Sequence, residues 1–92
     1  MFNKIIYAKS YNRGAEKFVK KYPELIEQYK KTLKLLELNP FNASLKLHRL
    51  SGKLSKLFAI SINISFRITL ELLISEKEII PINIGIFDDV YK

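Results

Sequence analysis

The strongest restriction on the fold of this 92-residue chain is an alternation of apolar and polar residues in its second half. Residues 58–73 have the sequence FAISINISFRITLELL, which keeps a period of two almost without interruption. Successive side chains of a β-strand point to opposite faces, so the pattern predicts strands with one buried face. A bend at residues 63–65 divides this stretch into two strands. A third strand is expected over residues 78–86, which completes an antiparallel meander.

The alternation also assigns side chains to the two faces of the predicted sheet. The apolar face is expected to hold Phe58, Ile60, Ile62, Ile64, Phe66, Ile68, Leu70, Leu72, Ile80, Ile82, Ile84 and Ile86. The opposite face receives Ala59, Ser61, Asn63, Arg67, Thr69, Glu71 and Asn83. Pro81 is expected on that second face, at an edge or where its missing N–H points away from a neighbouring strand.

The first half of the chain changes to a helical period. After a short apolar strand at residues 4–8, Ser10 is placed as the cap of a helix, and Pro23 as the first residue of a second helix that ends at Asn39 and Pro40. Residues 41–56 are expected to form a basic, irregular loop. The predicted buried stripes of the two helices are Tyr11, Ala15, Phe18, Val19 and Tyr22, then Ile26, Tyr29, Leu33 and Leu36.

These elements predict a single α+β domain over residues 1–92, in which an N-terminal strand and a two-helix hairpin pack on one face of a small antiparallel sheet. The chain has no cysteine, which excludes a disulfide scaffold and a thiolate metal site. No apolar run is long enough to cross a bilayer, and residues 1–7 do not resemble a signal peptide. We therefore expect a cytoplasmic protein without membrane association.

The net charge of +7 is concentrated in the first half of the sequence. Residues 1–56 contain 13 Lys and Arg against 4 Asp and Glu, whereas residues 57–92 contain 3 against 5. Such an excess favours an anionic partner, either nucleic acid or an acidic protein. A solvated Lys-rich surface is the alternative explanation.

Arg67 is a charged side chain in the middle of an alternating strand, and the sequence does not show which acidic residue would neutralise it. Its face is the one that the helices leave open, and a guanidinium on a rigid strand can form paired hydrogen bonds with phosphate oxygens. The alternative is a cross-strand salt bridge, for example with Glu71.

Other candidate groups are fewer. His48 lies in the basic loop and is either a surface residue or a catalytic one. Since there is no second histidine, we expect no metal and no cofactor. Tyr91 could stack on a base or cover the edge of the core. The sequence contains no Gly-rich phosphate loop and no defensible Ser/His/Asp arrangement.

Three short motifs resemble the RelE/ParE superfamily of type II toxins, within its RelE/StbE and YafQ-like mRNA interferase group. They are the basic loop HRLSGKLSKLF that begins at His48, the segment FRI around Arg67, and the closing segment IGIFDDVY that ends at Tyr91. Their order and spacing agree with the topology predicted above, and the resemblance covers essentially the whole chain.

The resemblance implies a toxin with a RelE-like microbial RNase-type fold that enters the ribosome and cleaves mRNA through the 2′-hydroxyl. It also implies a cognate antitoxin protein as partner in a hetero-oligomer, with the ribosome and mRNA as targets. Carried over by motif, Arg67 and Tyr91 are the catalytic candidates. The candidates for RNA binding are His48, Arg49, Lys53, Lys56 and Asn63.

The chain departs from the family pattern at Phe87, where the motif usually has His or Arg. Phenylalanine can neither carry a proton nor hold a charge, so the acid–base chemistry is expected to be weakened. Two other activities therefore stay open: a protein that binds antitoxin or ribosome without cleaving RNA, and an inhibitor of DNA gyrase similar to ParE.

Overall fold

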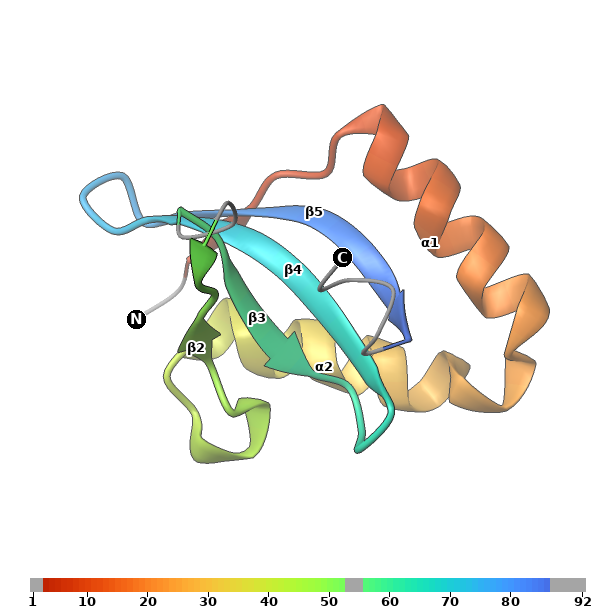
Figure 1. The fold of residues 1–92 in the computed structure, drawn as a ribbon. Coiled ribbons are helices and arrows are strands. Elements are labelled where there is room, and N and C mark those ends of the chain that lie inside the picture. Colours follow the sequence, from red (N-terminus) through yellow and green to blue (C-terminus); the bar gives the residue numbers. More distant parts are fainter. Residues whose placement is uncertain (1–2, 53–55, 87–92) are drawn as a thin grey trace.

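The computed structural model describes residues 3–52 and 56–86. Its elements are β1 (Lys4–Ile5), α1 (Lys9–Lys21), the short 3₁₀ turn η1 (Pro23–Leu25), α2 (Ile26–Leu38), a second 3₁₀ turn η2 (Ala43–Leu45), β2 (His48–Arg49), β3 (Phe58–Ser61), β4 (Phe66–Leu73) and β5 (Glu78–Ile86). Figure 1 shows α1 alongside β5 and α2 behind the sheet. The predicted α+β class is confirmed.

The sheet has five strands in the order β1-β5-β4-β3-β2. The predicted meander is present, because β3 with β4 and β4 with β5 are antiparallel pairs. Two features differ from the prediction. The N-terminal strand pairs in parallel with β5, so the sheet is mixed, and part of the expected loop forms the edge strand β2. Because β2 has only two residues and both are polar, the sequence pattern could not predict it as a strand.

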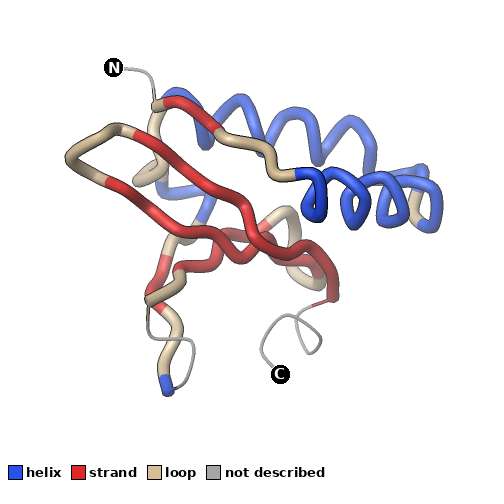
Figure 2. The backbone as a smooth tube through the Cα atoms, turned by 90° about the horizontal axis from the view of Figure 1, so that it is seen from above, coloured by secondary structure: helices blue, strands red, loops and turns tan. Residues whose placement is uncertain are grey.

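Both helices cover the same face of the sheet (Figure 2). The core between them contains three of the predicted residues of α1, Leu36 of α2, and from the sheet and the end of β3 Ile60, Ile62, Ile68, Leu70 and Ile79. The predicted Val19 and Tyr22 are partly buried against this core. The cap prediction was wrong in detail, since Ala8 rather than Ser10 precedes α1 and no side chain caps that helix. The first turn after Pro23 is 3₁₀ rather than α-helical.

The face assignment fails at Ile64, which lies between β3 and β4 and is 90% exposed, and in the first half of β5. Ile79 and Pro81 are buried, whereas Ile82 is 45% exposed. The cause in β5 is a register shift between Thr69 and Leu70, which inserts one extra residue of β5 opposite β4 and inverts the alternation on one side of it. The predicted inward positions of Ile80 and Ile82 were therefore wrong, and so was the outward position of Pro81.

The missing N–H of Pro81 is nevertheless accommodated as expected. The carbonyl oxygens of Lys77 and Ile79 accept hydrogen bonds from the N–H groups of Lys4 and Ile6, each at 2.8 Å, so residue 81 also directs its nitrogen to that outer edge. β1 ends at Ile5 and does not reach it. The proline thus leaves the pairing with β4 intact.

Candidate functional site

The register of the sheet places Arg67 in the middle of a row of three residues. Ser61 of β3 and Gly85 of β5 are its direct partners on the neighbouring strands. All three lie on the face that points away from the helices, because the alternate residues Ile60 and Ile68 are in the core. A cation is therefore flanked by one small hydroxyl side chain and one residue without a side chain.

The β3–β4 turn fixes the orientation of Arg67. Within the turn, Asn63 Oδ1 accepts hydrogen bonds from the backbone N–H groups of Ser65 (2.8 Å) and Phe66 (3.0 Å). Arg67 Nη1 then donates to the carbonyl oxygens of Asn63 and of Phe66, the latter at 3.1 Å. The guanidinium is thereby drawn toward the turn, and a preorganised guanidinium loses less entropy when it binds an anion.

This geometry bears on two expectations from the sequence. Arg67 and Glu71 lie on the same strand, β4, and form no salt bridge with each other, so the ion pair given as an example is absent. The side-chain oxygen of Asn63, proposed as an RNA contact, serves the turn. Its demonstrated contribution is to shape the backbone that holds Arg67.

A second row crosses the same face one step along the strands, through His48, Ala59, Thr69 and Asn83. Its middle is closed, because Ala59 and Thr69 are 0% and 2% exposed. Thr69 Oγ1 has no hydrogen-bond partner among the described residues. The expectation of a uniformly open face was therefore wrong: only the ends of this row, His48 and Asn83, are exposed.

His48 lies on this face at the edge strand, two strands away from Arg67. Its Nδ1 is 3.0 Å from the carbonyl oxygen of Lys46, which has a left-handed backbone with φ of 52°. A carbonyl oxygen can only accept, so this contact assigns the proton to Nδ1 and makes Nε2 the basic nitrogen of the neutral ring. From strand spacing and rise, the Cα atoms of His48 and Arg67 are roughly 12 Å apart, a span that a nucleotide could bridge.

Arg49 follows His48 but faces the opposite side of the sheet. It pairs with Phe58, and its guanidinium carbon lies 5.0 Å from the centre of the Phe58 ring, a cation–π contact. The structure therefore separates two residues that the sequence had grouped as one RNA-binding loop. Lys56 is exposed near the start of β3.

Three other candidates, Lys53, Phe87 and Tyr91, lie outside the described residues. Within residues 3–52 and 56–86, no cluster of His, Asp and Glu could hold a metal ion. In the same part of the chain, no helix is long and apolar enough to cross a membrane.

Sequence reasoning missed two features near this site. One is β2, which carries His48 into the sheet, and the other is Gly85 as the partner of Arg67. A glycine inside an alternating strand is a recognisable signal of close approach or of required space. Alternation places residue 85 on the same face as Asn83, but its position opposite Arg67 depends on the register of β4 and β5, which no local pattern revealed.

The sequence matches no protein-family model and no curated protein. Solved structures do match. YafQ from E. coli strain BL21(DE3) has a TM-score of 0.78 at 17% identity, with 98% of this chain and 99% of YafQ covered. The E. coli DinJ-YafQ toxin-antitoxin complex gives 0.77 at 18% identity, with 100% of both chains covered. The RelBE2 toxin-antitoxin complex of Mycobacterium tuberculosis gives 0.63 at 9% identity over 94% of this chain and 99% of that one.

These similarities extend over whole chains, so this protein has the fold of those toxin structures. The RelE-like fold predicted from the sequence is thereby confirmed. At such low identities the likeness establishes the fold alone, and the activity has to be argued from the residues.

Proposed function

We propose that this protein belongs to the RelE/ParE superfamily and is the toxin of a type II toxin–antitoxin pair that cleaves mRNA on the ribosome in the cytoplasm. The fold it shares with YafQ and with the toxin of RelBE2 supports this proposal. The observation that carries it is the placement of Arg67 on the central part of the sheet face opposite the helices, between Ser61 and Gly85 and oriented by the Asn63 turn.

The proposed reaction needs a cation at this point. When a ribose 2′-oxygen attacks the adjacent phosphorus, negative charge grows on the non-bridging oxygens until the bond to the 5′-oxygen breaks. The positive charge of the Arg67 guanidinium attracts those oxygens, and it stabilises the transition state more than the ground state because the negative charge is greater there.

The site is less well equipped for proton transfer than for stabilising negative charge. A base must take the proton of the 2′-hydroxyl, and an acid must give one to the leaving 5′-oxygen. His48 has a basic Nε2 on the correct face, and Tyr91 is the candidate from the family motif. Phe87 cannot contribute, so we expect slow cleavage that depends on the ribosome to position the mRNA.

The partner in this proposal is a cognate antitoxin. DinJ-YafQ and RelBE2 are both toxin-antitoxin complexes, and this chain matches their structures over nearly its full length. A net charge of +7 favours a partner with an acidic segment, which would neutralise the toxin and exclude RNA at the same time.

The test is mRNA cleavage in a reconstituted translation reaction, with the RNA ends mapped by primer extension. Arg67→Ala is compared with Arg49→Ala, a matched loss of one positive charge on the opposite face of the sheet. We expect Arg67→Ala to slow cleavage about a hundredfold or more, because it removes a donor to the transition state, and Arg49→Ala to retain most activity. Equal loss in both variants would mean that only overall charge matters, and full activity of Arg67→Ala would refute the site.

The same reaction separates the alternatives. Intact mRNA together with ribosome binding would indicate a protein that has lost nuclease chemistry, and inhibition of DNA supercoiling would indicate an action on gyrase. Phe87→His addresses the weakened chemistry directly: if the missing proton carrier limits the rate, this variant should cleave faster than the wild type.

A further inference from the structure

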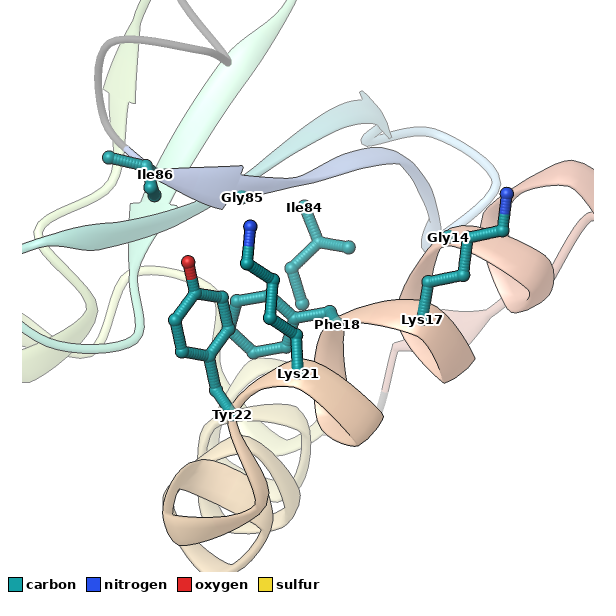
Figure 3. A pocket seen from close by; sticks show the side chains of 8 residues that line it. All are labelled: Gly14, Lys17, Phe18, Lys21, Tyr22, Ile84, Gly85 and Ile86. Atoms are coloured by element: carbon teal, nitrogen blue, oxygen red, sulfur yellow. The ribbon is translucent and has the colours of Figure 1, made fainter.

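A groove lies between the second half of α1 and the end of β5, apart from the Arg67 face (Figure 3). Its volume is about 200 Å³. The helix and the residue that follows it contribute Gly14, Lys17, Phe18, Lys21 and Tyr22, and the strand contributes Ile84, Gly85 and Ile86.

One wall of this groove is an unfinished sheet edge. β1 pairs only with Glu78 and Ile79, and its last hydrogen bond runs from the Ile6 N–H to the Ile79 carbonyl (2.8 Å). Beyond that point, within the described part of the chain, β5 pairs with β4 alone. A strand with one unpaired edge is a template for another strand.

The register identifies the backbone groups at that edge. The Phe66 carbonyl accepts from Ile62, so Phe66 faces β3, and its neighbour Arg67 faces β5 and pairs with Gly85. Ile84 and Ile86 therefore direct their N–H and C=O groups outward. The Ile84 N–H is already bonded to Asn83 Oδ1 at 2.9 Å.

Three outward groups have no partner among the described residues: the Ile84 carbonyl, the Ile86 N–H and the Ile86 carbonyl. One residue of a parallel strand placed opposite Gly85 would donate to the first and accept from the second, which is the pattern by which β1 pairs farther along the same edge. An antiparallel partner opposite Ile84 would need the Ile84 N–H as well, so along this stretch it could pair only opposite Ile86. The edge is therefore suited to a parallel strand in line with β1.

The other wall of the groove is formed by α1 and Tyr22. It is apolar at Phe18 and Tyr22, and open space lies beside Gly14. Phe18 and Tyr22 pack against Phe66, with ring centres 5.2 and 4.7 Å apart, so this apolar part is held in place by the core. A Cβ added to Gly14 would meet nothing within 4 Å. The space beside the helix at Gly14 can thus admit the side chains of an incoming segment.

The rim of the groove is positively charged. Lys17 and Lys21 line it, and Lys9, Arg13 and Lys20 lie on the same helix. The helix has one acidic residue, Glu16, which forms a salt bridge with Lys20 (3.0 Å) rather than with either lysine of the groove. Charge complementarity favours an acidic occupant.

We propose that this groove is the docking site for an extended, acidic segment of a partner protein, which adds a parallel strand to the edge of β5. Its backbone pairs with Ile84 and Ile86, its apolar side chains enter beside Gly14, and its carboxylates meet Lys17 and Lys21. The inference rests on the proposed function only in taking the antitoxin to be that partner. RNA fits less well, because the edge offers donors and acceptors at peptide spacing.

The first probe is a fluorescein-labelled peptide of alternating Glu and Val with Pro at both ends to prevent self-association. Its binding is followed by fluorescence anisotropy. Two matched peptides serve as controls: one with N-methyl groups on alternate residues, which cannot pair with a strand edge, and one with Lys in place of Glu. We expect only the first peptide to bind, with slower hydrogen exchange at the Ile86 N–H.

The chain offers a matched pair of variants at Gly14. Gly14→Trp fills the groove, whereas Gly14→Ala changes little of its space, and both residues favour a helix more than glycine does. We expect Gly14→Trp to weaken peptide binding about tenfold or more by blocking the site, while Gly14→Ala binds as the wild type does. Lys17→Glu combined with Lys21→Glu should transfer the preference to the Lys–Val peptide, with the fold checked by circular dichroism.

Equal binding of the N-methylated peptide, or undiminished binding to Gly14→Trp, would overturn the proposal. A labelled RNA oligonucleotide that binds the wild type and not Gly14→Trp would assign the groove to nucleic acid instead, which also overturns it. Arg67→Ala distinguishes the two proposals, because it should abolish cleavage and leave peptide binding intact. Cleavage without peptide binding would refute this inference alone.

Discussion

Tyr11 and Tyr29 form a polar contact inside an otherwise apolar core. Their hydroxyl oxygens are 2.9 Å apart and join α1 to α2. Tyr11 is only 2% exposed, whereas Tyr29 is partly buried and packs at the boundary of the core. The two hydroxyls are therefore not equivalent, because only that of Tyr29 has ready access to water when its partner is removed.

This asymmetry predicts unequal costs for removing either hydroxyl. Tyr29→Phe leaves the buried Tyr11 hydroxyl without its partner and should lower the free energy of unfolding by about 2 kcal/mol. Tyr11→Phe should cost less, and the double variant less than the sum of both. Urea denaturation measures all three. A larger cost for Tyr11→Phe would contradict the assigned roles.

The same pair predicts a loss of stability at alkaline pH. Burial raises the pKa of Tyr11 strongly and that of Tyr29 to a lesser degree, with the hydrogen bond between them as a secondary cause for Tyr11. The unfolded chain releases the phenolic proton near its ordinary pKa of 10.0, while the folded chain keeps it. The folded state then holds more protons, so stability falls as pH rises above that value, by up to about 1.4 kcal/mol per pH unit for each tyrosine. Tyr11→Phe should flatten this dependence in urea titrations at pH 9 to about 11. An unchanged slope would contradict the role given to Tyr11.

At the level of elements, the bulge in β5 decides which residues of that strand are in the core. It inserts Ile82 between Pro81 and Asn83, which pair with the consecutive residues Leu70 and Thr69 of β4. The half of β5 that pairs with β1 therefore buries odd-numbered residues, and the half beside the groove turns Ile84 toward the core. The extra residue also turns Gly85 to the side of Arg67.

Two isoleucines of β5 make a matched test of the bulge. Ile79 is 0% exposed and belongs to the core, so Ile79→Ala should cost about 3 kcal/mol through the cavity it leaves. Ile82 is 45% exposed, and Ile82→Ala should cost less than about 1 kcal/mol. Urea denaturation compares the two variants. The reverse order would mean that β5 keeps an uninterrupted alternation.

On the scale of the whole molecule, positive charge lies on two separate surfaces. The lysines of α1 and α2 point outward on the helical layer, while Arg67 and His48 lie on the other face of the sheet. Two faces are therefore suited to anions, and the groove beside β5 lies between the helical layer and the sheet. An acidic partner on the groove and RNA on the Arg67 face would occupy different surfaces.

The overall charge predicts that association with ribosomes weakens steeply as salt increases. Binding that releases counterions from RNA gives a linear fall of log K with log salt concentration, with a slope set by the number of neutralised phosphates. Co-sedimentation with ribosomes over a range of KCl measures it. Arg67→Ala should reduce the slope by about one, because a single phosphate contact is lost. A slope near zero would indicate that the lysines are only a solvated surface.

Local patterns in the sequence predicted most of the helices and strands and, within the site, the position of Arg67 but not that of His48. The period of two gave the meander and placed Arg67 opposite the core, and the helical period gave the buried residues of α1, because both depend only on which side chains must leave water. The positions of His48 and Arg49 on opposite faces could not be predicted. They depend on the pairing of a two-residue strand, which is a contact between distant segments.

The sequence by itself thus determined the fold class, the outward position of Arg67 and the excess of positive charge, since each follows from side-chain chemistry and local periodicity. The tertiary structure alone decided the parallel pairing of β1, the bulge that exchanges Pro81 and Ile82 between the faces, and the unpaired edge beside Gly14. The physical reason is that strand register and edge exposure arise from hydrogen bonds between segments far apart in the chain, and no local pattern encodes where those bonds stop.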